Sequence, residues 1–436
     1  AAKTNCHLPT GACISNSGRV HFSELKYVRR RHLCKEARAA GAHLDQPMAN
    51  TRTAATFFPP VMEARRWLDG VTHPTDRPLI NVSQAAPVDP PPLAMRQAMA
   101  DWVVNDDSTH LYGPVLGLDE LRSEVAAQWS SAYQGALQPD NVAITSGCNQ
   151  AFAAAISTLC AEGDEIIIPV PYYFNHRMWL DMAGVKTVPL DAGPSLIPDP
   201  DAAAALITPR TRAISLVTPN NPGGVEYSAD VVQAFFDLCR RHKIALIIDE
   251  TYRDFDSREG APHTLFQDSD WGDTLIQLYS FSKAYRLTGH RVGAMIASPA
   301  RLAEAEKFLD TVTICPNQLG QRAALWGMQN LGVWLARERL EILDRRAAIT
   351  EGFGSLADKG WDLMGCGAYF AYVRHPFDLP SDQLAPKLVR DAGVLLLPGT
   401  MFMPPEISAG AKQLRIAFAN IDRAGIAVLF NRLSNL

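Results

Sequence analysis

Lys283 stands in a sequence setting that suggests chemistry. It belongs to the stretch SFSKAYRLTGHR (280–291), which also holds two serine hydroxyls and, eight residues after the lysine, Arg291. Apolar runs of strand length, TLIQLY and RVGAMIAS, flank the stretch, which is therefore predicted to be a turn at the end of a buried strand. Lysines are rarely buried unless they are paired or used in a reaction, so Lys283 is a candidate for either a salt bridge or covalent catalysis.

Polar groups also follow other predicted strands. In IIDETYRDF, Asp249 ends an apolar run and Tyr252 comes three residues later, whereas in TPNNPGG Asn221 precedes a proline and two glycines. In TSGCNQ the chain turns from strand to helix at Gly147 and Cys148, where free backbone N–H groups could bind an anion such as phosphate. Ligands of open α/β sheets bind beyond the carboxyl ends of the strands, so we expect these groups to lie together.

Pyridoxal 5′-phosphate is one ligand that would use the whole set. Lys283 would carry its aldehyde as a Schiff base, and Asp249 would hold the proton on its ring nitrogen so that the ring can accept electrons. Asn221 and Tyr252 would bind the ring hydroxyl. The phosphate would be bound by the backbone at Gly147 and Cys148 and by the side chains of Ser280, Ser282 and Arg291. Taken singly, TPNNPGG could be a tight loop, and Lys283 could pair with Asp249 in a structural salt bridge.

Strand and helix patterns alternate through the middle of the chain. The runs NVAITSG, DEIIIPVP, AISLVTP, IALIIDE, TLIQLYS and RVGAMIAS are typical of strands, and helical segments such as CNQAFAAAISTLC and SADVVQAFFDLCRRHK separate several of them. This alternation predicts an α/β fold whose large domain, residues 96–320, has a mostly parallel, doubly wound sheet. A long charged helix, RAALWGMQNLGVWLARERLEILDRRAA, and the strands GAYFAYVRH, VLLLPG and QLRIAFAN then predict a smaller α+β domain made of residues 48–95 and 321–436.

Composition narrows the class of partner. The 436 residues are 47% hydrophobic and 20% charged, without an apolar run of transmembrane length, so no membrane span is expected. A net charge of −5 argues against nucleic acid as the main partner and favours a small molecule. The cysteines beyond residue 47 are widely spaced and form no C-x-x-C pair, which favours reduced thiols in a cytoplasmic setting and gives no support to zinc.

Residues 1–47 differ from the rest of the chain. They hold eight Lys or Arg and only three Asp or Glu, include RRRHLC, and show little apolar periodicity. An Arg-rich targeting segment is one interpretation, but we expect a disordered extension, with Met48 as the natural start of the catalytic chain.

The motifs, taken in order, resemble the fold type I pyridoxal-phosphate enzymes, specifically the class I/II aminotransferases, which include aspartate and kynurenine aminotransferases. The resemblance covers residues 78 to 436. It rests on YGPVLGLDELR (112–122), TSGCNQA (145–151), PYYFNH (171–176), PNNPGG (219–224), DETY (249–252), SFSKAYRLTGHR (280–291) and LRIAFAN (414–420). Cys148 departs from the other small residues that are frequent in the family at this position, and we expect only its backbone to contribute.

The resemblance implies roles for three further residues. The aromatic ring that stacks on the cofactor falls on Tyr173, or in a shifted register on Tyr172, and the arginine that binds the substrate α-carboxylate falls on Arg415. The tyrosine that reaches the phosphate of a neighbouring subunit falls on Tyr112, which would also line the substrate site together with Asn221. Without the resemblance, Tyr173 could be a core aromatic, Tyr112 a turn residue and Arg415 a solvent-facing side chain.

The resemblance also implies a ping-pong transamination between an L-amino acid and a 2-oxo acid, in a homodimer with shared active sites. Lys283 would be the base, with Asp249 and Tyr252 as its catalytic partners. The sequence does not reveal a second arginine for a side-chain carboxylate, so the amino donor and acceptor stay open.

Two other classes compete with this interpretation. A carbon–sulfur β-lyase on the same fold would use every residue named above and would differ only in its substrate. An aminotransferase-like effector-binding module of a transcription regulator is disfavoured, because residues 1–77 are short and irregular for a winged-helix domain with a linker.

Overall fold

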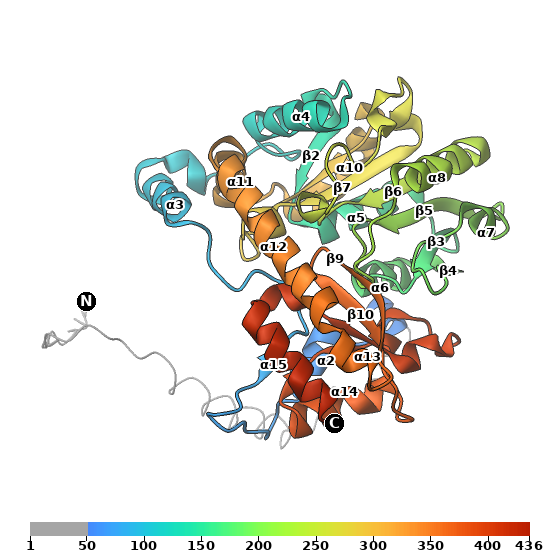
Figure 1. The fold of residues 1–436 in the computed structure, drawn as a ribbon. Coiled ribbons are helices and arrows are strands. Elements are labelled where there is room, and N and C mark those ends of the chain that lie inside the picture. Colours follow the sequence, from blue (N-terminus) through green and yellow to red (C-terminus); the bar gives the residue numbers. More distant parts are fainter. Residues whose placement is uncertain (1–50) are drawn as a thin grey trace, which may run out of the picture. The chain divides into compact units, whose positions relative to one another are not determined.

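The computed structural model describes residues 51–436 (Figure 1). The extension predicted for residues 1–47 and the start proposed at Met48 lie outside these residues. Within residues 51–436, no helix is long and apolar enough to cross a membrane. In the same part of the chain, no group of His, Cys, Asp and Glu side chains could hold a metal ion.

A seven-stranded sheet forms the larger of the two layered parts. Its strand order is β2-β8-β7-β6-β5-β3-β4. The strands from β7 to β4 run parallel to one another, whereas β8 is antiparallel to both β7 and β2. The predicted α/β fold with a mostly parallel sheet is therefore confirmed. The strand bounds are β2 (Val142–Thr145), β3 (Glu165–Val170), β4 (Lys186–Asp191), β5 (Thr211–Val217), β6 (Ala245–Asp249), β7 (Leu275–Ser280) and β8 (Gly293–Ile296).

Helices cover both faces of this sheet, which explains why its strands are apolar runs. Alternate residues of one strand enter different cores: Leu246 and Ile248 pack on one face, and Ile247 packs on the other. The first face carries α4 (Asp119–Tyr133), α8 (Ala229–His242) and α11 (Gln318–Asn330). The second face carries α5 (Cys148–Leu159), α6 (Phe174–Ala183) and α10 (Pro299–Thr313). The helices α3 (Leu93–Asn105) and α7 (Pro200–Ala204) also belong to this part.

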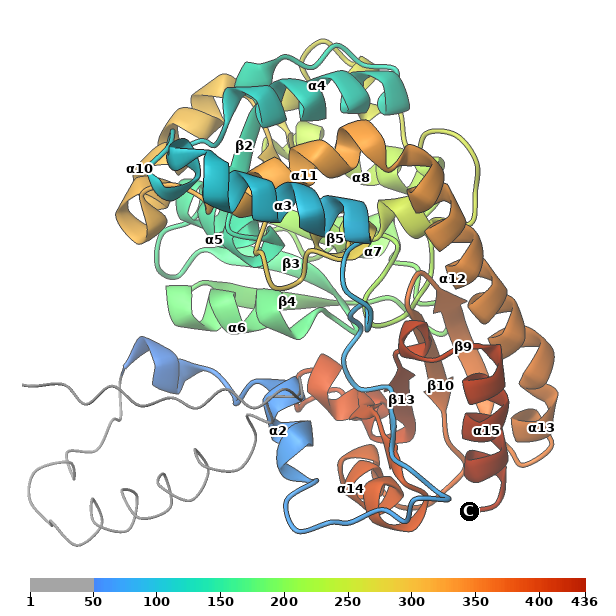
Figure 2. The same cartoon turned by 90° about the vertical axis from the view of Figure 1, so that its left-hand side faces the viewer.

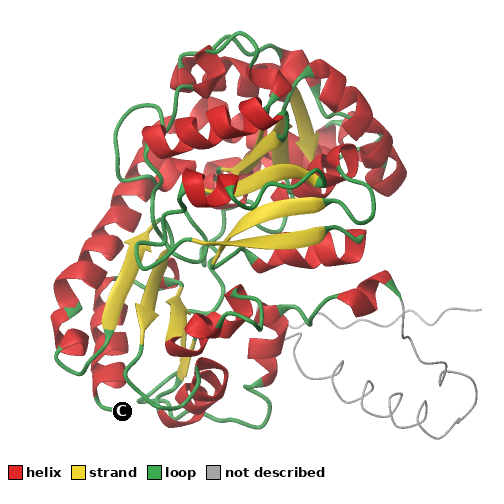
Figure 3. Cartoon of the chain, turned by 90° about the vertical axis from the view of Figure 1, so that its right-hand side faces the viewer, coloured by secondary structure: helices red, strands yellow, loops and turns green. Residues whose placement is uncertain are grey.

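A second, smaller set of strands lies apart from the large sheet (Figure 3). It is built from both ends of the described chain. Its antiparallel sheet has the order β12-β13-β10-β9, and a separate pair joins β1 to β11 in parallel. The strands are β1 (Ile80–Asn81), β9 (Asp362–Gly367), β10 (Phe370–Arg374), β11 (Val394–Leu395), β12 (Leu397–Pro398) and β13 (Gln413–Ile416). They pack with α2 (Pro60–Arg66), α13 (Gly354–Ala357), α14 (Ser381–Asp391) and α15 (Arg423–Ser434). The α+β part expected from the N- and C-terminal segments is present, whereas the boundaries proposed near residues 95 and 320 stay predictions.

The long helix predicted for residues 322–348 is wrong in one respect, because it is two helices. The break falls at Leu331, between α11 and α12 (Gly332–Gly352). Leu331 leaves the helical conformation with φ −109° and ψ 18°, and its side chain is buried in the core of the large sheet. The flanking residues Asn330 and Gly332 have low helix propensity, so the chain bends there at little cost. The bend lets α12 continue toward the second sheet (Figure 2).

The part of the chain with the large sheet and the part with the smaller sheet contact each other through backbone atoms at several glycines. Residues 219–224 follow β5, and Gly224 of this loop has φ +72°. A Cβ added to Gly365 of β9 would overlap the carbonyl oxygen of Gly223, and one added to Gly367 would overlap that of Gly224. Only residues without side chains allow this approach, because protein backbone cannot shift as a flexible side chain can.

We predict that Gly365→Ala lowers the free energy of unfolding by about 1–3 kcal/mol, because the methyl group must displace the 219–224 loop. Urea denaturation followed by circular dichroism measures this effect. Gly354→Ala is the matched control, since a Cβ at that helical position meets no atom within 4 Å. Equal stabilities of the two variants would contradict the backbone contact.

Candidate active site

A cavity of about 410 Å³ lies at the carboxyl ends of β5, β6 and β7. Its volume is in the range of ordinary small-molecule sites. The predicted residues that line it are Cys148, Tyr173, Asn221, Asp249, Tyr252, Ser280, Ser282, Lys283, Arg291 and Arg415. These residues come from distant parts of the sequence, and the strand ends bring them together as expected.

Two predicted residues do not line this cavity. Gly147 lies directly beside it, because a Cβ on this residue would collide with the guanidinium group of Arg291. Tyr112 follows α3 and is 79% exposed. The less favoured aromatic, Tyr172, is buried in the core beneath the sheet, whereas Tyr173 lines the cavity.

Asp249 ends β6 and is almost fully buried. His176 places Nε2 3.3 Å from its Oδ2, and the backbone N–H of Thr251 donates to Oδ1 at 3.0 Å. Burial alone would raise the pKa of Asp249, but the nearby imidazole of His176 and the bonds from Thr251 outweigh burial and lower that pKa. The carboxylate is therefore ionised at neutral pH and can attract a proton or a cation in the cavity.

His176 is a site residue to which sequence reasoning assigned no role. It lies in α6, one helical turn after Tyr173, and is fully buried. Its ring stacks on Phe152 with centroids 3.8 Å apart, and Tyr173 meets it edge-on at 5.0 Å. The signal was present in PYYFNH, where an aromatic and a histidine three residues apart share one face of a helix.

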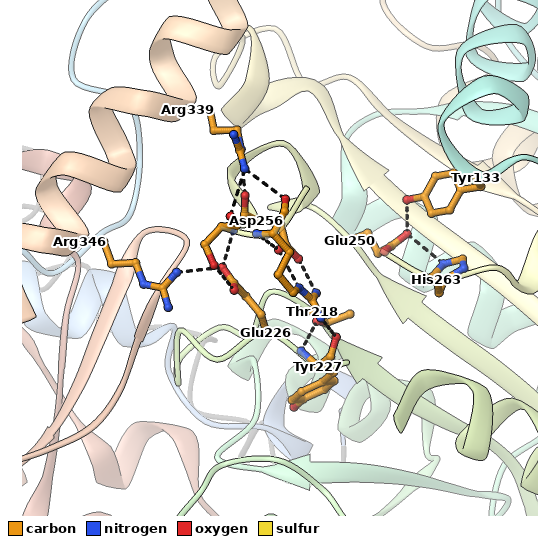
Figure 4. Close-up of polar contacts among 11 residues, drawn as sticks. Tyr133, Thr218, Glu226, Tyr227, Glu250, Asp256, His263, Arg339 and Arg346 are labelled. Atoms are coloured by element: carbon orange, nitrogen blue, oxygen red, sulfur yellow. Dashed lines mark hydrogen bonds and ion pairs between the residues drawn. The ribbon is translucent and has the colours of Figure 1, made fainter. Parts of the chain in front are cut away.

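The residue after Asp249 anchors the same strand end on the other side. Glu250 accepts a hydrogen bond of 2.6 Å from the hydroxyl of Tyr133 in α4, and His263 Nε2 lies 3.5 Å from its carboxylate (Figure 4). Consecutive side chains of a strand point to opposite faces, so Asp249 and Glu250 fix the strand end from both faces of the sheet.

Lys283 lies in the short helix α9 (Phe281–Ala284) directly after β7. Its Nζ donates to the carbonyl oxygen of Ala85 at 2.7 Å, so the structure does not support the alternative salt bridge with Asp249. Burial, and then the nearby cations Arg291 and Arg415, lower the pKa of Lys283 to about 8. The neutral fraction of the amine near physiological pH is therefore far larger than for an ordinary lysine, although still a minority, and a neutral amine is a nucleophile and a base.

An anion-binding cradle faces the cavity beside Lys283. Gly147 precedes the first turn of α5 and has no side chain that could cap the free N–H groups of that turn. Arg291 Nη1 lies 3.4 Å from the Ser282 hydroxyl, and the Ser280 hydroxyl accepts from the backbone N–H of Ser282 at 3.3 Å. A helix N-terminus, hydroxyls and a guanidinium group together suit a phosphate.

Arg415 forms a second anion site in the same cavity. Its guanidinium group is buried between the rings of Phe370 and Phe402, each 4.9 Å from Cζ. Nη1 donates to Asn221 Oδ1 at 2.9 Å, and Nη2 donates to the Ser83 carbonyl oxygen. Burial lowers the pKa of Arg415 to about 10, although nearby tyrosines oppose this effect. Its Nε has no hydrogen-bond partner among the described residues, so the site can accept a carboxylate.

Segments of the second part of the chain hold this site against the large sheet. Arg339 of α12 donates to the carbonyl oxygens of Asp256, Ser257 and Arg258 at 2.9, 3.2 and 3.1 Å. Arg346, two turns later, lies 3.4 Å from a carboxylate oxygen of Glu226 (Figure 4). These bonds connect α12 to the segments that follow β5 and β6, which carry Asn221 and Tyr252.

The fold is α/β, and its cavity combines an amine of lowered pKa, an ionised carboxylate and arginine side chains that suit anions. Residues 77–433 match the family model described as aminotransferase class I and II, and the chain therefore belongs to this family. The predicted enzyme class, an aminotransferase, is confirmed.

Individual relatives agree with this assignment. The aromatic aminotransferase ISS1 of Arabidopsis thaliana is 27% identical over 88% of this chain and 95% of its own length. The valine–pyruvate aminotransferase of Mycobacterium tuberculosis is 29% identical over 78% of this chain and 87% of its own. The structure of Thermus thermophilus aspartate aminotransferase with maleate superposes with a TM-score of 0.77 at 22% identity, covering 88% of this chain and 98% of that chain. That likeness shows the fold.

We predict that the reaction of Lys283 with an aldehyde rises with pH through a midpoint near 8, because only the neutral amine attacks a carbonyl group. Reductive labelling of the ligand-free chain at a series of pH values, read by peptide mass spectrometry, measures this midpoint. The exposed Lys307 serves as the internal reference. Arg291→Gln should raise the midpoint of Lys283, because it removes one of the two neighbouring cations. A midpoint near 10.4, the ordinary value, would contradict the electrostatics of the site.

Proposed function

We propose that the protein is a pyridoxal-phosphate-dependent aminotransferase that moves an amino group between an L-amino acid and a 2-oxo acid in two half-reactions. The observation that carries the proposal is a half-buried lysine with a lowered pKa, in one cavity with an ionised aspartate and two separate anion sites. An amino acid and a phosphorylated cofactor would need all of these groups at once.

The residues present fit the cofactor. Arg291, the hydroxyls of Ser280 and Ser282 and the N-terminus of α5 suit its phosphate, and Asp249 suits a protonated ring nitrogen. Tyr173 would pack on the ring, Asn221 and Tyr252 would face its hydroxyl, and Lys283 would hold its aldehyde carbon. When bound, pyridoxal phosphate supplies a ring that accepts the electron pair released from the substrate Cα–H bond.

The protein's own groups would then perform three tasks. The guanidinium group of Arg415 binds the α-carboxylate of amino acid and oxo acid alike, which orients the Cα–H bond. The amine of Lys283 takes the proton from Cα in one half-reaction and returns it in the other, a role that its pKa of about 8 suits. The carboxylate of Asp249 keeps a proton on the ring nitrogen, because the ionised group stabilises the positive charge there.

A panel of L-amino acids with 2-oxoglutarate as acceptor tests this function. We predict that wild-type protein with pyridoxal phosphate is yellow and releases a 2-oxo acid, whereas Lys283→Ala remains folded but loses nearly all turnover. Absorbance, circular dichroism and oxo-acid release measure the three properties, and Lys307→Ala, an exposed lysine on α10, is the control. Protein that binds no pyridoxal phosphate, or that releases thiol from cystathionine without transferring an amino group, would overturn the assignment.

We further propose that the enzyme is a homodimer in which Tyr112 completes the partner's site. An exposed apolar surface surrounds this tyrosine: Leu111 is 65% exposed and Val104 77%. The end of α10 extends the surface with Val312 and Ile314, and Gly113 N–H contacts Cys315 Sγ at 3.4 Å next to it. Apolar side chains gathered on one surface favour a protein partner, and a two-fold interface would place each Tyr112 at the other subunit's cavity.

Subunit mixing tests this arrangement. We predict that Tyr112→Ala and Lys283→Ala homodimers each have low activity, and that mixed dimers regain activity, because one of their two sites then carries both defects and the other carries none. Dissociation with dilute denaturant, reassembly and an assay of amino transfer measure the gain. Mixing Lys283→Ala with Asp249→Ala is the control: both residues serve the site of their own subunit, so each site of the mixed dimer keeps one defect and no activity is regained. A Tyr112→Ala mixture that gains no activity would contradict a shared site.

A further inference from the structure

The cavity contains one more cationic side chain than the proposed reaction uses. Its charged lining residues are Asp249 and the four cations Arg65, Lys283, Arg291 and Arg415. The proposed function assigns Arg291 to a phosphate, Arg415 to the α-carboxylate and Lys283 to proton transfer. Arg65 is left without a role.

Arg65 enters the cavity from α2, whose residues Val61 and Met62 also line it. Its Nη2 donates to the side-chain oxygen of Gln84 at 2.8 Å, and Nη1 lies 4.0 Å from the sulfur of Met62. Both contacts are with neutral groups. A guanidinium group has five N–H donors, so Arg65 keeps the capacity to bind an anion.

The neighbouring Arg66 differs from Arg65 in its contacts. Its Nη1 forms an ion pair of 2.6 Å with Glu63 of the same helix, and its guanidinium group also lies over the ring of Phe58. Arg66 does not line the cavity. Both adjacent arginines are exposed, but Arg66 is paired with a carboxylate away from the cavity, whereas Arg65 lines the cavity and is bonded to a neutral amide.

Arg65 and Arg415 are connected through two consecutive residues. Arg415 donates to the carbonyl oxygen of Ser83, and Arg65 donates to the side chain of Gln84. Consecutive Cα atoms lie about 3.8 Å apart, so both guanidinium groups border one short segment of the cavity wall. A short molecule with a carboxylate at each end could contact both.

We propose that Arg65 binds the side-chain carboxylate of the substrate, so that dicarboxylic amino acids and their 2-oxo acids are the preferred substrate class. This inference rests on the proposed aminotransferase function. The planar guanidinium group can bind a carboxylate through two parallel hydrogen bonds, and the amide N–H groups of Gln84 can add a further donor. Apolar side chains, which Val61 and Met62 could contact, are the competing class.

Pairs of amino acids that have equal size but different charge distinguish the dicarboxylic substrate class from the neutral one. With the holoenzyme, kcat/KM should be higher for aspartate than for asparagine and higher for glutamate than for glutamine. Arg65→Gln should lower kcat/KM for both acidic amino acids about tenfold or more, mainly through KM, because a charge-assisted hydrogen bond is lost. The same substitution should leave the values for neutral amino acids unchanged, and Arg65→Lys should restore part of the acidic preference.

Arg66→Gln is the matched control, since it removes the same charge from the adjacent position outside the cavity. Arg66→Gln should leave the ratios of kcat/KM between acidic and neutral amino acids unchanged. If Arg65→Gln and Arg66→Gln reduce acidic substrates equally, the effect is a general change of surface charge and the proposal is overturned.

A binding measurement gives a readout without turnover. Titration calorimetry of the holoenzyme with succinate and with butyrate compares two four-carbon acids that differ by one carboxylate. Succinate should bind more tightly to wild type, and Arg65→Gln should remove that difference. Equal affinities in wild type would refute the proposal even if the variant failed to fold.

The outcomes also distinguish this inference from the function on which it rests. If no amino acid in the panel is transaminated, the proposed function fails. If neutral amino acids are transaminated as well as acidic ones, and Arg65→Gln changes nothing, the function stands and the role of Arg65 is wrong.

Discussion

The gathering of several positive charges around one cavity is the constraint on which the rest of the site depends. Arg415 is buried, Lys283 is half-buried, the exposed Arg291 lines the same space, and Asp249 is the carboxylate among them. Unpaired charges are costly to bury, and here the lysine responds with a pKa of about 8. Anionic groups of a cofactor and a substrate would relieve the excess positive charge, so the electrostatics of the cavity favour anionic ligands.

The close approach of the two parts of the chain makes this concentration of charge possible. Gly224 and Gly365 let the loop after β5 touch β9 through backbone, while Arg339 connects α12 to the segment that follows β6. Arg415 then reaches Asn221 from a different sheet. Specificity and chemistry are consequently separated in the fold: the large sheet carries Lys283 and Asp249, and the smaller part supplies the groups that would bind the substrate.

Much of the fold and site could be predicted because the informative residues are local in sequence. Lys283 and Arg291 lie in one motif, and Asp249 ends a run that only a buried strand explains. Other features lacked such a local signal. The apolar pattern of the sequence did not reveal β4, because its residues Lys186–Asp191 include a proline and both charged and apolar positions. It also did not reveal the helix break at Leu331, where tertiary packing of a leucine overrides a continuous helical pattern.

The amino-acid sequence by itself determined the alternation of strands and helices and the lysine, aspartate and arginine motifs, because each depends on residues only a few positions apart. The order of these motifs along the chain then indicated the enzyme class. The tertiary structure alone decided which distant groups meet. His176 reaches Asp249 from a helix 73 residues earlier in the chain, a separation that sequence spacing cannot convert into a contact. Arg65 and Arg415 lie 350 positions apart and line one cavity only because the two ends of the described chain pack together, so the folded chain, and not a motif, places a third guanidinium group in the site.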